Sequence, residues 1–281
     1  MPDDARNFIT QAAPDLARWV ARFQPETLPV LARTAALIED YRDNEDAVDA
    51  HLLAEDLATD PLMTLKLLAH VGRLRRGREG TDIETVTAAL LLLGITPFFK
   101  AFSGLQTVEG QLADRPEALD GFNAVLTRSH RAANFAIGFA VHRLDHDAAL
   151  IHSAALLHDF AELLLWLRAP DLALEIQRRQ AADQSLRSSV VQRELLQIEL
   201  PDLQHSLMGN WRLPAVLVRI TDDQQHNNST QVRNVLLAIR LARHSAQGWD
   251  NAALPDDVHE TAQLLNLGVE PTWKLLREID E

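Results

Sequence analysis

The stretch LIHSAALLHDFAELLLWL, residues 150–167, organises the rest of the chain, because it is apolar on nearly every side. A helix without a polar face belongs in the interior of a protein, so each polar group on it needs a partner or a function. At about 100° per residue, four polar side chains would gather within roughly a third of the helix circumference. They are His152, His158, Asp159 and Glu162. We therefore predict one buried helix that carries one polar stripe.

The adjacent residues His158 and Asp159 have two interpretations. An imidazole nitrogen and a carboxylate oxygen can bind one metal ion, and these ligands suit Zn, Fe or Mn. Buried His and Asp side chains are more often held by hydrogen bonds to a neighbouring helix. The pair alone favours the hydrogen-bonded interpretation, and its surroundings must decide.

The composition of the 281 residues is that of a helical globular protein. Hydrophobic residues make up 47% and charged residues 24%, glycine is low at 11, and Leu and Ala recur at helical spacing, which predicts an all-α fold. Without cysteine there are no disulfides, thiolate metal sites or cysteine nucleophiles, which suits a cytoplasmic protein. The N-terminus lacks an export signal, and no apolar run approaches the ~20 residues of a membrane span. We predict neither export nor membrane insertion.

The formal net charge of −13 would repel a polyphosphate backbone, so nucleic-acid binding is disfavoured. One dense basic cluster stands out in GRLRRGREG, and it consists of Arg73, Arg75, Arg76 and Arg78. Most such clusters are solvated turns or helix ends that meet the C-terminal dipole. We expect that role here, and phosphate or partner binding is the less favoured alternative.

Capping residues and prolines mark several predicted helix boundaries. Asp60 can cap a helix whose first turn holds Pro61, and Thr81–Glu84 has the spacing of a capping box. Gly94 is placed to end the helix that follows, and Thr96–Pro97 repeats the pattern of cap and proline. Further predicted helices cover residues 13–22, 30–41, 47–58, 98–105, 122–143, 170–182, 185–198, 201–211, 215–220, 230–246, 255–265 and 271–279.

Polar connections between these helices are candidates for a junction between sub-bundles and for ligand-binding loops. The stretch 106–121, which holds glycines and a proline, is the candidate junction between two sub-bundles. The polar loop 222–228 and the turn Trp211–Pro214 are where we would look for a ligand, since loops on rigid scaffolds often carry recognition. An ordinary solvated connection remains the simpler interpretation of both.

Four stretches resemble the motifs of one family, in the right order. LAEDLATDPLMTLKLLAHV at 53–71 has a helix pair around Asp-Pro, ETVTAALLLLGI at 84–95 closes on Leu-Gly, AALLHDFAELLLW at 154–166 is the central segment, and 199–214 ends in Trp-Arg-Leu-Pro. They are similar to the HDOD family, bacterial signalling relatives of the HD-type metal-dependent phosphohydrolases. The resemblance implies a multi-helix bundle of HD-domain-like architecture. It divides the chain into a helical extension, 1–27, an HDOD-like domain, 28–223, and C-terminal helices packed on that domain, 224–281.

The sequence departs from the family pattern at two places. The family usually has Asn-Ser after the early leucine pair, where this chain has His70-Val71. The family also tends to have a His pair shortly after Leu-Pro, whereas this chain continues with Asp222-Asp223-Gln224-Gln225-His226.

The resemblance also implies what a metal site would need. HD enzymes use a first His on an earlier helix, the His-Asp pair and a distant Asp on a later helix to hold one or two metals. His158 and Asp159 match the pair, and His130 matches the first His, although Ser129 could equally occupy that place. Where HD enzymes have Asp after Arg-x-Ala, this chain has Arg243, whose charge would oppose a divalent metal.

Two functions follow from this resemblance. The leading hypothesis is a non-catalytic bacterial signalling or regulatory module without a cofactor, which acts on an unknown signalling protein or a small ligand. Its polar cluster would be structural and would comprise His130, His158, Asp159, His205 and Arg243. The alternative is a phosphohydrolase acting on a nucleotide or cyclic dinucleotide. In that case Fe, Mn or Zn would bind His130, His158 and Asp159, with Glu162 completing the shell, and His158, Asp159 and Glu162 would be the catalytic residues.

Overall fold

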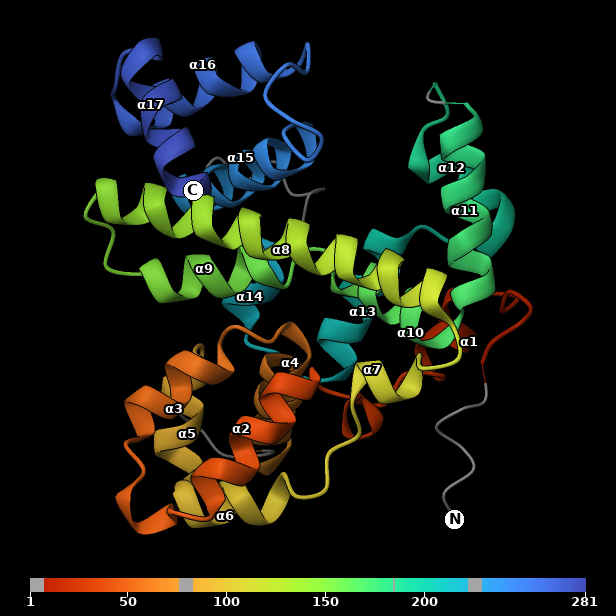
Figure 1. Cartoon of the computed structure of the whole chain (residues 1–281), viewed down its shortest axis with the longest axis vertical. Coiled ribbons are helices and arrows are strands. Elements are labelled where there is room, and N and C mark those ends of the chain that lie inside the picture. Colours follow the sequence, from red (N-terminus) through yellow and green to blue (C-terminus); the bar gives the residue numbers. More distant parts are fainter. Residues whose placement is uncertain (1–7, 76–82, 184, 222–228) are drawn as a thin grey trace. The chain divides into compact units, whose positions relative to one another are not determined.

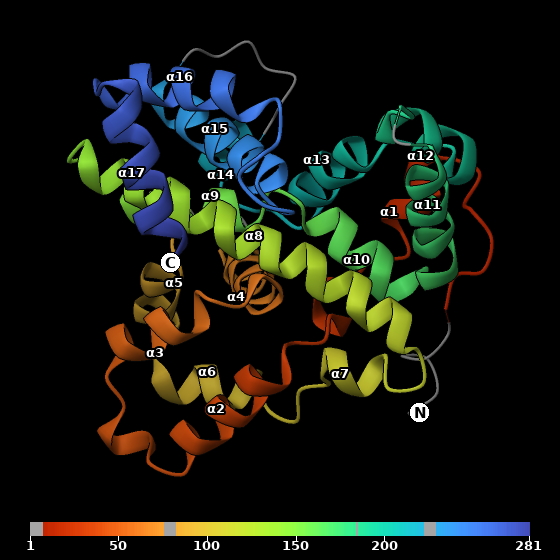
Figure 2. The ribbon, with the colours of Figure 1, turned by 45° about the horizontal axis from the view of Figure 1, so that its top comes forward.

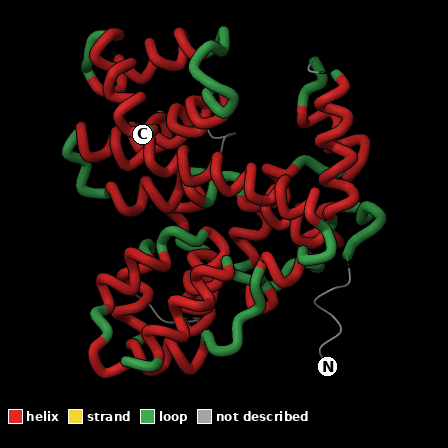
Figure 3. Tube along the Cα trace, viewed as in Figure 1, coloured by secondary structure: helices red, strands yellow, loops and turns green. Residues whose placement is uncertain are grey.

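The computed structural model describes residues 8–75, 83–183, 185–221 and 229–281, which form helices joined by loops (Figure 3). No strand occurs in these ranges, apart from an isolated bridge between Val30 and Thr107. The all-α prediction is therefore confirmed. The chain divides into two compact units, of which unit 1 comprises Met1–Asn123 and Phe160–Ala215, and unit 2 comprises Ala124–Asp159 and Val216–Glu281. The predicted three-part division of the chain stays a prediction.

The helices follow one another along the chain with short connections (Figure 1). Those of unit 1 are α1 (Leu16–Val20), η1 (Pro25–Thr27), α2 (Ala32–Arg42), η2 (Glu45–Ala47), α3 (Ala50–Leu57), α4 (Pro61–Leu74), α5 (Val86–Leu93), α6 (Ile95–Ala101), α7 (Val108–Gln111), α10 (Phe160–Arg168), α11 (Pro170–Ala182), α12 (Ser188–Leu196) and α13 (Leu200–Asn210). Those of unit 2 are α9 (Ala148–Leu156), α15 (Thr230–His244), α16 (Leu254–Leu265) and α17 (Val269–Asp280). The chain passes between the units at three places: within α8 (Pro116–His142), between Asp159 and Phe160, and within α14 (Ala215–Ile220).

The start of α4 follows the prediction from its cap and proline. The Asp60 carboxylate accepts hydrogen bonds from the backbone N–H groups of Leu62 at 2.8 Å and Met63 at 3.1 Å, and Pro61 occupies the first turn. The second carboxylate oxygen of Asp60 accepts a hydrogen bond from the N–H of Leu31 at 2.8 Å, and Leu31 directly precedes α2. Because Asp60 is fully buried, this one side chain caps α4 and also fixes the start of α2 from inside the core of unit 1.

The boundaries of α5 and α6 differ partly from the predictions. Thr85 caps α5 by accepting from the N–H of Ala88 at 3.2 Å, and residues 81 and 82 of the predicted capping box lie outside the described residues. Gly94 ends α5 as predicted, at φ +81°, a conformation that favours glycine. The predicted cap at Thr96 is wrong, because α6 already begins at Ile95 and the Thr96 hydroxyl contacts Glu45 instead.

The central segment is two helices and not the one predicted over residues 150–167. Helix α9 ends at Leu156, a turn follows, and α10 begins at Phe160. In the turn, the N–H of His158 donates to the carbonyl of Ala155 at 3.3 Å, a tighter spacing than that of an α-helix. The predicted single polar stripe is therefore wrong, since His152 lies on α9 and Glu162 on α10.

The predicted burial of this segment is confirmed, because the apolar side chains of α9 and α10 belong to the core. Contrary to the sequence-based expectation, one described stretch, Ala148–Arg168, is long and apolar enough to cross a membrane by length and composition alone. However, 72% of its apolar window is buried inside the structure. Core helices of soluble proteins have this character.

A close backbone approach in unit 1 joins the residue just after the first resembling stretch to the last one. A Cβ atom on Gly72, in α4, would lie 2.6 Å from the carbonyl oxygen of Arg212. Only glycine allows this contact between α4 and the turn that follows α13. In the same turn, Trp211 stacks on Phe160 with ring centroids 5.7 Å apart and donates its indole N–H to the carbonyl of Phe23 at 3.4 Å.

Unit 2 is built around α15, which packs against α9 and α16, and α16 packs against α17 (Figure 2). The C-terminal helix is also tied to α8 by a two-pronged ion pair. Arg131 Nε lies 2.7 Å from Asp280 Oδ1, and Arg131 Nη2 lies 2.7 Å from Asp280 Oδ2. Such a fork fixes the orientation of both helices within the unit.

Candidate functional site

The His158–Asp159 pair lies at the turn between α9 and α10, where Asp159 gathers three partners. Asp159 Oδ1 accepts from Arg243 Nη2 at 2.7 Å, and Asp159 Oδ2 accepts from Arg128 Nε at 3.1 Å. His158 Nδ1 lies 3.0 Å from Asp159 Oδ1. We call these four residues the Asp159 cluster. It connects the turn to α8 through Arg128 and to α15 through Arg243.

The charges of the cluster keep Asp159 ionised. Burial by itself would raise the pKa of this carboxyl group, whose side chain is only 11% exposed. The charge of Arg243, the hydrogen bond and charge of His158 and the charge of Arg128 outweigh burial and hold the pKa of Asp159 well below its usual value. At neutral pH the cluster is therefore a carboxylate held between two guanidinium groups.

The structure brings together only some of the predicted site residues. His158, Asp159 and Arg243 form one cluster. His130 is half-buried on α8, and its charge acts on His152 of α9: burial lowers the pKa of His152, and the charge of His130 lowers it further.

Two other predicted site residues belong to unit 1, whereas the Asp159 cluster belongs to unit 2. Glu162 lies on α10, on the far side of the turn in the chain, and His205 is exposed on α13. The break in the central helix thus removes the geometric reason for grouping Glu162 with His158.

The residues of the Asp159 cluster do not fit a divalent metal. Both oxygens of Asp159 are engaged by guanidinium N–H groups, and His158 Nδ1 faces the same carboxylate. Across the part of the chain that the structure describes, no group of three or more His, Asp or Glu side chains is arranged to hold a metal ion. A cation would have to displace the arginines before it could reach Asp159.

Sequence reasoning missed Arg128, which contributes one of the two guanidinium groups. On the predicted helix 122–143, Ser129 and His130 resemble metal ligands, whereas an arginine does not. A carboxylate inside a protein needs cationic partners, and this requirement could have pointed to Arg128. Arg128 directly precedes Ser129 on the same predicted helix.

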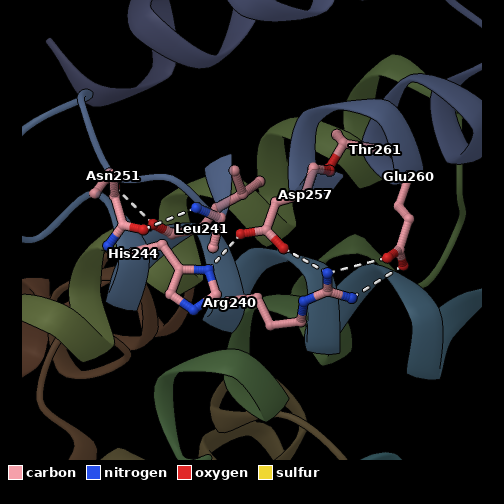
Figure 4. Close-up of polar contacts among 9 residues, drawn as sticks. Arg240, Leu241, His244, Asn251, Asp257, Glu260 and Thr261 are labelled. Atoms are coloured by element: carbon pink, nitrogen blue, oxygen red, sulfur yellow. Dashed lines mark hydrogen bonds and ion pairs between the residues drawn. The ribbon is translucent and has the colours of Figure 1, made fainter. Parts of the chain in front are cut away.

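The sequence analysis also missed the buried carboxylate of Asp257 on α16, whose polar contacts are drawn in Figure 4. Asp257, in the first turn of α16, has one oxygen 2.5 Å from Arg240 Nη2 and the other 2.5 Å from His244 Nδ1. Arg240 also forms a fork with Glu260, at 2.9 and 3.0 Å. We call these four residues the Asp257 cluster, and it joins α15 to α16.

The predicted polar loop and the turn Trp211–Pro214 give no site among the described residues. The polar loop 222–228, which includes Asp222, Asp223 and His226, lies outside the described residues, as do Arg76 and Arg78 of the basic cluster. At the turn Trp211–Pro214, Trp211 and Leu213 are buried and serve packing within unit 1.

Comparisons with known proteins agree with the motifs. The HDOD domain model matches residues 28–227, and the predicted resemblance is thereby confirmed. The MmoQ response regulator from Methylococcus capsulatus str. Bath has a similar structure, with a TM-score of 0.68 and 24% identity over 89% of this chain and 97% of that chain. A virulence factor from Campylobacter jejuni subsp. jejuni has a TM-score of 0.61 and 17% identity over 90% of this chain and 94% of that chain.

At these identities the two structures establish the fold and nothing further, and no curated protein matches the chain significantly. The family match, in contrast, covers well over half of the sequence and includes the motifs on α4, α5, the central segment and α13. The chain therefore belongs to the HDOD domain family.

Proposed function

We propose that this HDOD protein is a non-catalytic signalling or regulatory module, which acts by binding a partner or a ligand. In this proposal the Asp159 cluster is a structural joint and not an active site. The observation that carries the proposal is the placement of Arg243 Nη2 at 2.7 Å from Asp159 Oδ1, with Arg128 Nε on the other oxygen.

The charge of the two arginines supports this proposal. In an effective dielectric constant of 20, a divalent cation about 4 Å from one guanidinium is repelled by roughly 8 kcal/mol. Metal-dependent hydrolysis needs the opposite arrangement, in which carboxylates and imidazoles face an ion that activates water. The cluster as it stands has the charge pattern of a buried ion pair that holds helices together.

Metal content tests the proposal directly. The protein would be purified without chelators or added metal, beside the variant His158→Ala/Asp159→Ala and a control, Asp250→Ala, in which an exposed carboxylate of the same unit is removed. We expect far less than one equivalent of Fe, Mn or Zn in all three proteins by elemental analysis. We also expect no hydrolysis of bis(p-nitrophenyl) phosphate, with or without added metal.

Bound metal would instead support the alternative function, a metal-dependent phosphohydrolase. Near-stoichiometric metal in the wild type and in Asp250→Ala, lost in His158→Ala/Asp159→Ala, would contradict the proposal. Circular dichroism on the double variant would show whether it retains its helices, so that loss of metal is not confused with unfolding.

A further inference from the structure

A basic cavity lies within unit 1 and shares no residue with the Asp159 cluster. Its volume is about 620 Å³, and its walls come from segments 21–28 and 101–106, from α4 and from Arg168. Small-molecule sites in proteins commonly have volumes of roughly 300–1,000 Å³. The cavity is therefore large enough for a metabolite.

The lining of this cavity carries a positive charge that the rest of the protein does not share. Four cationic side chains, Arg22, Lys66, Arg73 and Arg168, line it together with one carboxylate, that of Glu26, which leaves a surplus of three positive charges. The whole chain, in contrast, has a net charge of −13. We propose that this cavity binds a small phosphorylated molecule that carries a diphosphate group.

Lys66 gives the cavity a fixed cationic group. Its side chain is only 6% exposed, and Nζ donates to the carbonyl oxygens of Glu26 and Leu28, each at 2.7 Å. An ammonium group has three N–H donors, so one more hydrogen bond can be made toward a ligand. Burial lowers the pKa of Lys66 to about 8, against the opposite effect of the Asp60 charge, and the group is still mainly protonated at neutral pH.

The walls of the cavity are held by contacts within unit 1. Val30 N–H donates to the carbonyl of Gln106 at 2.9 Å, which joins the end of one wall to the other. Phe102, at the start of the second wall, packs against His70 of α4 with ring centroids 5.3 Å apart, and its carbonyl accepts from Arg42 at 3.2 Å. A site that is already formed loses less free energy to ordering when a ligand binds.

Charge and geometry favour phosphate over carboxylate as the ligand group. One phosphate monoester carries about −1.5 to −2 charges at neutral pH, so a diphosphate comes close to the surplus of three positive charges. Arginine forks match phosphate oxygens in pairs, and Arg22 and Arg73 are both exposed enough to reach a ligand. Without a ligand, Arg73 is paired with Glu26, so Glu26 competes with an incoming anion.

This inference deepens the proposed function, because it names a ligand class for a domain that works by binding. The inference rests on the proposed function in one respect, which is that the bound molecule is a signal and is not a substrate. The cavity and the Asp159 cluster share no residue, so each can be tested without the other.

Calorimetric titration of the full chain with inorganic pyrophosphate, and separately with adenosine diphosphate, tests the cavity. We expect saturable binding that Arg73→Gln weakens roughly tenfold, because one charge-assisted contact is lost. Glu26→Gln should have the opposite effect and tighten binding several-fold, because it removes the competing carboxylate. Both side chains are about half exposed, so neither substitution should unfold the protein.

The control is Arg178→Gln, which removes one positive charge from an exposed position on α11 that does not line the cavity. Its affinity should equal that of the wild type. Absence of saturable binding at millimolar pyrophosphate, or binding that Arg73→Gln and Glu26→Gln leave unchanged, would overturn the cavity proposal and leave the proposed function standing. Binding with intact cavity dependence but with conversion of pyrophosphate to phosphate, seen by phosphorus NMR, would support the cavity and contradict the proposed function.

Discussion

The Asp159 and Asp257 clusters of unit 2 both stabilise a carboxylate that is largely removed from solvent, although only Asp159 lies in a family motif. In each cluster a buried carboxylate is held by an arginine of α15 and by a histidine Nδ1 within 3.0 Å. The Asp257 cluster does this between two helices that pack against each other, α15 and α16. The comparison indicates that carboxylate, histidine and arginine together serve helix packing in this protein, and it supports a structural interpretation of Asp159.

The two clusters differ in depth and in where their partners originate. The Asp257 side chain is 1% exposed, against 11% for Asp159, so its charge is the more costly to leave without a partner. Asp257 draws Arg240 and His244 from one helix, α15, whereas Asp159 draws its two arginines from α8 and α15. The Asp159 cluster therefore depends more on the arrangement of distant segments.

The largest effect is expected at the deeper cluster. Asp257→Asn should lower the free energy of unfolding by about 3 kcal/mol, because it leaves His244 without a charged partner and Arg240 with Glu260 alone. Chemical denaturation followed by tryptophan fluorescence measures this change. The control is Asp256→Asn, an exposed carboxylate in the same first turn, which should cost less than about 0.5 kcal/mol. Equal losses of stability in the two variants would mean that Asp257 stabilises the protein through the helix dipole and not through the Asp257 cluster.

A smaller loss, about 2 kcal/mol at neutral pH, is expected for Asp159→Asn, with a defined pH dependence. The folded pKa of Asp159 is lowered relative to an unfolded value of about 3.9, so its contribution is present above that value and is lost as pH falls through the folded pKa. The stability difference between wild type and Asp159→Asn should therefore be constant near neutrality and shrink below about pH 4.

Denaturation curves at several pH values check this second prediction. Asp250→Asn, which changes an exposed carboxylate of the same unit, serves as the control and should show a small difference at every pH. A difference for Asp159→Asn that does not change down to the acid transition would show that Asp159 is not held by ion pairs.

The smallest effect is expected at Arg243, which stands where the resemblance to HD enzymes implies an Asp. Arg243 is 46% exposed, so Arg243→Gln should cost only about 1 kcal/mol. A double-mutant cycle measures how strongly the two residues interact. The combination of Arg243→Gln with Asp159→Asn should show a coupling free energy of about 0.5 kcal/mol or more. The same arginine change combined with Asp257→Asn should be closer to additive. Equal coupling in both cycles would mean that the two clusters act as one network.

The sequence alone determined the features that depend on neighbours in the chain. The periodicity of Leu and Ala predicted helices, and Asp60, Pro61 and Gly94 act at the boundaries where their local chemistry placed them. Caps and prolines work within one helical turn, so a short stretch of sequence contains the information that they need. Motif order likewise identified the family, and Arg243 could be read from the sequence as a cation where the resemblance implies an acid.

Only the tertiary structure decided where the central segment breaks and what its polar groups contact. An apolar stretch of this length can be one buried helix or two, because both satisfy the same hydrophobic pattern. The break at residues 157–159 places Asp159 between arginines that lie 31 and 84 residues away in the chain. The cavity likewise combines segments near residues 25, 70, 105 and 168. Ion pairs and cavities of this kind are formed by packing between distant segments, and for that reason local sequence patterns could not predict them.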